Sequence, residues 1–261
     1  MPNNKQQKKK KYNWLGIKYT IAGTFGVILI SFIFVFTYNS FAQTYFFNVK
    51  NIVVNGLNHL HSQEVITQAQ IDEDINILEI NLFLVRKRLC SHDWILDAKV
   101  ARKLPNTIVI NLEEQKPLAI ISLNKIKYLM NIKGVIFKKW AMSDPVDLPV
   151  VEGLNLLDIS YKKRKFSKSL SAVMSILKMS GKPDSVIPFN TLMGINIDSE
   201  IGLTLYTKGS VGEIKLGNDD YAGKYHCLRR LIPQLRKNNL YDKMKWIDLT
   251  DMDRIVVNVP S

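Results

Sequence analysis

The pattern of apolar and polar residues divides the chain into one long apolar segment followed by many short alternating ones. No charged residue occurs from position 19 to position 49, and the core of this run, residues 21–38, is almost entirely apolar. At 1.5 Å per residue, this core forms a helix of about 27 Å, close to the thickness of a bilayer core. Residues 19–41 are therefore predicted to form a single transmembrane helix.

Basic residues in front of this segment predict its orientation. Positions 1–18 contain six lysines and no acidic residue. Because basic flanks of a membrane span stay in the cytoplasm, this tail is predicted to be cytoplasmic and the rest of the chain to face outward. The residues assigned to this role are Lys5, Lys8, Lys9, Lys10, Lys11 and Lys18.

A cleaved secretory signal is the alternative interpretation of the same segment. Ser40 and Ala42 have the spacing of a cleavage site, and a basic region followed by an apolar one is also typical of signals. The apolar core of a signal usually has about 7 to 15 residues, however, and this core is longer. The length favours a retained anchor.

Behind the apolar run, hydrophobic periodicity predicts elements in the order β-α-α-β-β. Ser62 is the expected N-cap of the first helix. Together the elements span about 70 residues, which predicts one α+β domain over residues 46–117. The strands are predicted at 46–55, 98–102 and 107–113, and the helices at 62–70 and 81–92.

Residues 118–261 are predicted to form a mixed, mainly antiparallel β domain with two helices. Asn218 or Asp219 is expected to cap the second helix, and Lys224 to contribute only its aliphatic stem to the apolar stripe of that helix. Residues 192–217 are predicted to be a three-stranded meander. The strands are expected at 127–131, 135–138, 192–198, 202–207, 213–217, 245–249 and 254–259, and the helices at 167–180 and 220–237.

Charge and composition exclude some classes of function. The net charge is +13, but the tail lysines account for six of these charges and the remaining +7 is spread along the chain. This balance indicates membrane topology and attraction to lipid headgroups, and no base-reading motif accompanies it, so nucleic-acid binding is not expected. Cys90 and Cys227 are interpreted as small buried apolar side chains, and a disulfide between them stays open as the alternative.

Candidate catalytic and metal-binding residues are few. His59 and His61 lie on one face of the chain, but two ligands alone do not make a metal site. The acidic residues from Asp248 to Asp253 lack the glycine and the distal glutamate of a calcium loop, and a hairpin turn explains them better. No signature of a catalytic nucleophile or a phosphate-binding loop is present. These observations predict a binding or scaffolding protein without a cofactor, a metal or a small-molecule ligand, and not an enzyme.

Taken together, the segments resemble the FtsQ/DivIB family of bacterial cell-division proteins, which have a basic tail, one membrane span, a POTRA domain and a β domain. The resemblance covers essentially the whole chain and is clearest over residues 94–119, with Ala98, Arg102 and Pro105 in place. One departure is that Thr250-Asp251 stands where the family usually has a basic–aromatic pair. The short tail is more similar to FtsQ than to DivIB.

The resemblance implies a non-enzymatic scaffold in the inner membrane at the division septum, with a cytoplasmic N-terminus and periplasmic domains. Its implied partners are FtsB and FtsL, with FtsW and FtsI beyond them. The last strands are implied to bind FtsB by strand addition, which needs a free edge with alternating side chains. The expected contact residues are Trp246, Ile247, Asp248, Leu249, Arg254, Val256, Val257 and Val259.

The sequence leaves several alternatives open. The last strand is expected at a free edge, but it would also fit an internal position in the sheet. A second partner surface is expected on the basic helix that carries Arg86, Lys87 and Arg88, although such a charge run is usually a solvated face. The whole chain would also fit an exported wall-binding or wall-modifying domain, or another envelope assembly adaptor with a POTRA domain.

Overall fold

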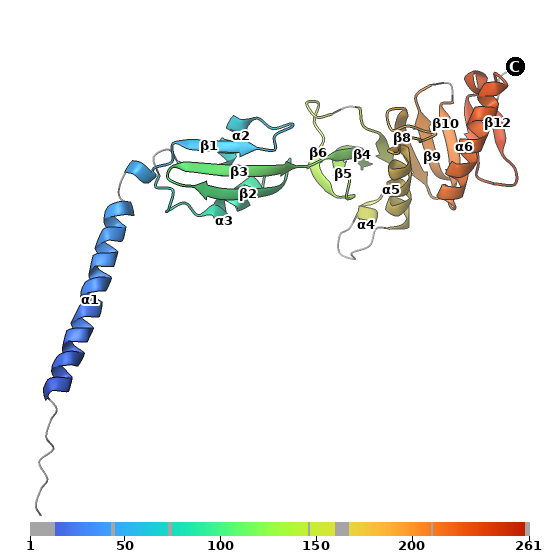
Figure 1. Ribbon diagram of the computed structural model, residues 1–261. Coiled ribbons are helices and arrows are strands. Elements are labelled where there is room, and N and C mark those ends of the chain that lie inside the picture. Colours follow the sequence, from blue (N-terminus) through green and yellow to red (C-terminus); the bar gives the residue numbers. More distant parts are fainter. Residues whose placement is uncertain are drawn as a thin grey trace, which may run out of the picture. The chain divides into compact units, whose positions relative to one another are not determined.

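The computed structural model describes residues 14–42, 45–72, 75–145, 147–159, 167–209 and 211–258. Within these ranges the chain divides into two compact units. The first runs to Ser91 and includes Asp97–Leu112, and the second consists of His92–Leu96 and the chain from Glu113 onward. Figure 1 shows the elements of each unit coloured along the sequence.

Helix α1 (Trp14–Ala42) contains the predicted span. Its segment Lys18–Thr37 is long and apolar enough to cross a membrane, and its large apolar side chains are exposed. Two threonines in this segment, Thr24 and Thr37, donate their hydroxyls to carbonyls one turn earlier, which satisfies polar groups within an apolar run. Lys18 is exposed, and the other tail lysines lie outside the described residues.

The first unit contains the predicted β-α-α-β-β order. In its three-stranded sheet the order is β1-β3-β2, and β1 runs parallel to β3. The core lies between the helices and the sheet, where Val65, Leu89, Ile108 and Ile110 are buried. After the short 3-10 helix η1 (Tyr45–Phe47), the elements are β1 (Asn51–Asn55), α2 (Ser62–Ala69), α3 (Leu82–Leu89), β2 (Ile95–Lys103) and β3 (Thr107–Glu114).

Two local predictions in this unit were wrong. The first strand begins at Asn51 and not at residue 46, because residues 45–47 form a 3-10 turn. Ser62 is the first residue of α2 and not its cap; His61 holds the cap position without a side-chain capping bond. At α3, by contrast, the Asn81 side chain accepts a hydrogen bond from the Leu84 amide, which satisfies one of the free donors of the first turn.

The second unit is built on a nine-stranded sheet with the order β12-β11-β10-β9-β8-β7-β4-β5-β6. Five of its strand pairs are antiparallel, while β4–β7, β7–β8 and β10–β11 are parallel. The prediction of a mixed, mainly antiparallel sheet is therefore confirmed. Its strands are β4 (Pro117–Leu123), β5 (Ile126–Asn131), β6 (Ile136–Lys139), β7 (Val150–Glu152), β8 (Leu192–Asp198), β9 (Gly202–Thr207), β10 (Glu213–Gly217), β11 (Trp246–Asp248) and β12 (Val256–Asn258).

The helices of this unit pack along β8 to β10, where Figure 1 shows α5 and α6 beside the strands. Leu177 of α5 and Leu228 of α6 join Ile195 and Ile214 of the sheet in one core cluster. The two predicted helices are confirmed as α5 and α6, and one further short helix precedes them. The elements are α4 (Leu156–Ile159), α5 (Lys168–Ser180), α6 (Tyr221–Lys237) and the 3-10 helix η3 (Tyr241–Lys243).

The cap of α6 corrects another prediction. Asp220, and not Asn218 or Asp219, accepts the hydrogen bond from the Gly223 amide. The side chain of Asp219 is held elsewhere, by the ammonium of Lys224. Both cysteines are free and half-buried, so they are less buried than was expected, although Cys227 packs against the core.

Candidate functional site

Strand β12 lies at one end of the nine-stranded sheet and pairs antiparallel with β11. Within the part of the chain that the structure describes, no strand pairs with its outer side. The backbone amides and carbonyls of that side are therefore open to another strand. Of the residues predicted to contact a partner, Val259 lies outside the described residues.

The two faces of β12 have different roles. Val257 lies opposite Ile247, which is fully buried, and Val257 itself packs against the core. Val256 lies opposite Asp248 and is 40% exposed. Because successive side chains of a strand point to opposite faces, Val257 supports the fold while Val256 faces outward.

The residues predicted on β11 divide in the same way. Ile247 and Leu249 are buried and belong to the core, so their side chains are unsuited to direct contact with a partner. Trp246 is half-buried, and the ammonium of Lys215 lies 5.4 Å from the centre of its ring. Arg254 is exposed just before β12. Among the residues predicted to contact a partner, those on the outer side of β12 and Arg254 are therefore accessible to it.

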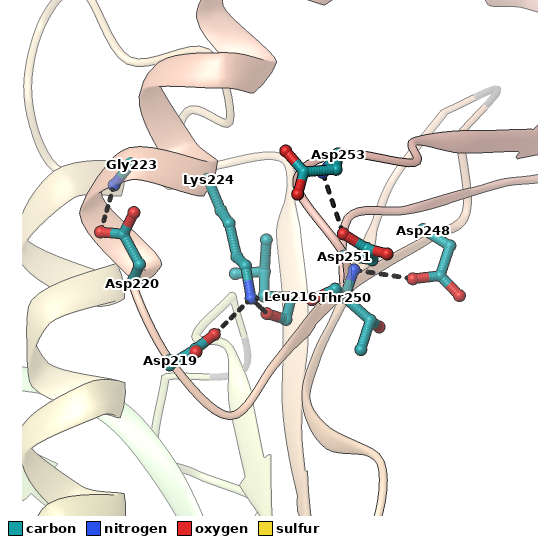
Figure 2. A network of polar contacts seen from close by, with 9 residues as sticks. All are labelled: Leu216, Asp219, Asp220, Gly223, Lys224, Asp248, Thr250, Asp251 and Asp253. Carbon is teal, nitrogen blue, oxygen red and sulfur yellow. Dashed lines mark hydrogen bonds and ion pairs between the residues drawn. The ribbon is translucent and has the colours of Figure 1, made fainter.

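The acidic residues between β11 and β12 shape the hairpin through its backbone. The Asp248 carboxylate accepts from the Thr250 amide at 2.8 Å, and the Asp251 carboxylate accepts from the Asp253 amide at 2.9 Å. Both are turns in which an Asp side chain replaces a backbone acceptor. Figure 2 shows the two turns side by side at the end of β11. This geometry fits the prediction that the acidic residues form a hairpin turn and not a calcium-binding loop.

A buried lysine connects this hairpin to α6. Lys224 is 1% exposed, and its ammonium donates to the Leu216 carbonyl at 2.8 Å, to the Asp219 carboxylate at 2.7 Å and to the Thr250 carbonyl at 3.2 Å. Three donors thus meet three acceptors from three segments (Figure 2). The expectation that only the aliphatic stem of Lys224 would be buried was wrong, because its charged end is buried too.

This ammonium also changes the acidity of its neighbour. The hydrogen bond and the positive charge of Lys224 hold the pKa of Asp219 below its ordinary value. At Tyr221, burial raises the pKa of the phenol, and the negative charge of Asp219 adds to that effect. Since the side chain of Asp219 is 81% exposed, water screens this ion pair, and the two carbonyl contacts carry most of the attachment.

The basic residues predicted as a second surface are partly engaged inside the first unit. Arg86 pairs with Asp97 at 2.6 Å and donates to the Ala98 carbonyl, and this pairing lowers the pKa of Asp97. Arg88 donates to the Gln70 carbonyl at 3.0 Å, just after α2. Lys87 is exposed. Two of the three cations therefore fasten α3 to neighbouring elements.

Arg102, in the segment that carried the family resemblance, has a structural role. Its guanidinium donates to the carbonyls of Ile77, Leu78 and Ile80 and so holds the connection between α2 and α3 against β2. A planar guanidinium carries five N–H donors and can therefore reach several carbonyls at once. In the sequence, Arg102 stood out only because it belongs to the segment that resembles the family. Its neighbours in the sequence did not predict these contacts.

Gly153 follows directly after β7, at a position where the backbone requires glycine. It has φ +84°, and a Cβ atom there would lie 1.8 Å from the carbonyl oxygen of Ile197 on β8. Only glycine allows this conformation together with such a close approach of two backbones. The position is thus a requirement of the sheet and not a contact for a ligand.

An N-terminal apolar helix, a β-α-α-β-β unit and a mixed sheet with a free edge define a single-pass membrane protein with a POTRA domain and a β domain. A family model described as POTRA domain, FtsQ-type, matches residues 47–115, and one described as cell division protein FtsQ/DivIB, C-terminal, matches residues 119–250. The chain belongs to the FtsQ/DivIB family of bacterial cell-division proteins.

Individual relatives agree with this assignment. Cell division protein FtsQ of Geotalea daltonii is 30% identical over 95% of this chain and 90% of its own length. Cell division protein FtsQ of Syntrophotalea carbinolica is 29% identical over 85% of this chain and 77% of its own length. Cell division protein DivIB of Clostridium tetani is 34% identical, but over only 43% of each chain. The chain is therefore similar to FtsQ proteins over nearly its full length.

Proposed function

We propose that this protein is a non-enzymatic scaffold of the division machinery that binds FtsB by strand addition to the outer side of β12. In this role it holds FtsB and FtsL near the septal wall-synthesis enzymes FtsW and FtsI. The observation that supports the proposal is the one-sided pairing of β12, with Val256 exposed on its outward face and Val257 anchored in the core.

The proposal includes location and orientation. The protein spans the inner membrane once through α1, at the septum, with the lysine tail in the cytoplasm and both compact units in the periplasm. A periplasmic position brings the edge of β12 to the same side as wall synthesis. A second surface is proposed on α3, where it centres on Lys87 because Arg86 and Arg88 are engaged in internal contacts.

The proposed FtsB site can be tested by introducing a charge at Val256, the exposed position of β12. We expect Val256→Asp to weaken binding of the purified FtsB–FtsL complex to the full chain in nanodiscs roughly fivefold, about 1 kcal/mol, because an aspartate opposes pairing at a strand edge. Val256 is a better position than Val257, where a charge would enter the core and disturb the fold as well. Binding is measured by biolayer interferometry.

A matched control exists in the first unit. Val53 on β1 has the same side chain, also lies on an edge strand and is 43% exposed, so Val53→Asp makes an equal chemical change away from β12. We expect this variant to bind FtsB–FtsL like the unmodified chain. Unchanged binding by Val256→Asp, with a thermal unfolding curve like that of the parent, would refute strand addition at β12.

A further inference from the structure

A groove on the second unit is separate from the proposed FtsB site. It has a volume of about 440 Å³ and lies beside α6, between the loop after α5 and the ends of β9 and β10. No residue of β12 lines it. We name it the α6 groove; the residues that line it include Lys208, Val211, Ile214, Arg229, Ile232 and Arg236.

The rim of the α6 groove is cationic. Lys208, Arg229 and Arg236 are exposed there, and the described residues that line the groove include no acidic side chain. Outside the lining, Asp184 pairs with Arg229 at 3.0 Å, with both side chains about 60% exposed, so this charge is only partly neutralised. Arg236 lies over the ring of Tyr241, 4.7 Å from its centre, which fixes the direction of its guanidinium. The rim therefore favours an anionic group.

The floor of the α6 groove adds two further features. Val211, Ile214 and Ile232 are buried and form an apolar base. Pro233 lies inside α6 and has no amide hydrogen, so it cannot donate to the carbonyl of Arg229 one turn earlier. Arg229 and Pro233 both line the groove.

These features together select the chemistry of an occupant. A free phosphate or sulfate satisfies the cations but offers no apolar group to the floor. A peptide with alternating acidic and aliphatic residues supplies carboxylates for the rim and aliphatic side chains for the floor. We propose that the α6 groove is a docking site for an acidic, aliphatic peptide segment of a partner protein.

The test uses a fluorescein-labelled decapeptide of alternating glutamate and leucine, with both ends blocked, and the full chain in phosphatidylcholine nanodiscs. Binding is measured by fluorescence anisotropy. We expect Arg229→Gln/Arg236→Gln to raise the Kd about tenfold, since two partly exposed ion pairs are lost. Arg230→Gln/Lys237→Gln removes the same charge from α6 at residues that do not line the groove, and we expect its Kd to stay at the parent value.

Each of the following results would overturn the proposal: equal loss of binding in the two double variants, equal binding of a decapeptide in which serine replaces leucine, or displacement of the peptide by inorganic phosphate at low concentration. The last two would show a simple anion site. Val256→Asp, which tests the FtsB site, should bind the decapeptide normally, so the two proposals fail independently. Vesicles rich in phosphatidylglycerol serve as a competitor, and displacement by them would identify a lipid headgroup and also overturn the proposal.

Discussion

Replacement of Lys224 by methionine would test how the hairpin before β12 is held. Methionine keeps the aliphatic packing of the stem but removes the ammonium that reaches Leu216, Asp219 and Thr250. The Leu216 carbonyl is then left buried without a donor, at a cost of about 1–3 kcal/mol. The Thr250 carbonyl lies in an exposed residue and adds less.

Two effects reduce this cost. The carboxylate of Asp219 is largely exposed and returns to water, and the desolvation of a buried ammonium is no longer needed. The net loss is about 2 kcal/mol, smaller than the usual cost of breaking a buried ion pair, because no buried charge is left behind. A loss of this size accelerates local amide exchange about thirtyfold.

Hydrogen exchange measured by mass spectrometry on residues 216–219 and 249–254 provides the assay. Lys237→Met, on the exposed part of the same helix, is the matched control and should leave exchange unchanged. Asp219→Asn should have little effect, because the ion pair is exposed to solvent and the carbonyl contacts remain. Parent-like exchange in Lys224→Met, or equally fast exchange in Asp219→Asn, would refute this account of the network.

Two further predictions concern the polar contacts of each unit. Arg102→Met should lower the stability of the first unit by about 1–2 kcal/mol, because carbonyls between α2 and α3 lose their donors. Amide hydrogen exchange of residues 76–80 measures this loss, and Lys103→Met is the exposed control. Asp97 and Asp219 have lowered pKa values, so their stabilising contribution is complete above the ordinary carboxyl pKa of about 3.9 and is lost as the pH falls through the lowered folded-state values. Thermal melting should therefore depend little on these groups from pH 7 to about pH 4 and should fall below that, less steeply in Asp97→Asn, whose carboxylate is bonded to Arg86 and to the Ala98 amide; an identical fall in that variant would contradict the assignment.

Hydrophobic periodicity correctly predicted the strands whose apolar and polar residues alternate clearly and whose ends are marked by turn residues. The meander expected at 192–198, 202–207 and 213–217 matches β8, β9 and β10 at both ends. Strand β4 was missed because its run of apolar residues does not alternate and gives no period to detect. That run is a strand buried by long-range pairing with β5 and β7.

Contacts between distant segments were beyond any local pattern. The apolar stripe of α6 placed the stem of Lys224 correctly, but the fate of its ammonium depends on Leu216 and Thr250, which the fold brings together. The same holds for Arg102, whose acceptors lie more than twenty residues earlier in the chain. A side chain with several donors finds its partners only when the chain has folded.

By itself, the sequence determined the apolar helix, the order of most elements and the resemblance that the family models confirm. Periodicity, charge asymmetry and motif order are properties of neighbouring residues, so they can be read without a fold. The tertiary structure decided that β11 pairs parallel with β10 across α6 and that β12 is therefore left at the edge. It also decided which face of β12 is buried, because Val256 and Val257 are chemically identical and differ only in what lies opposite them.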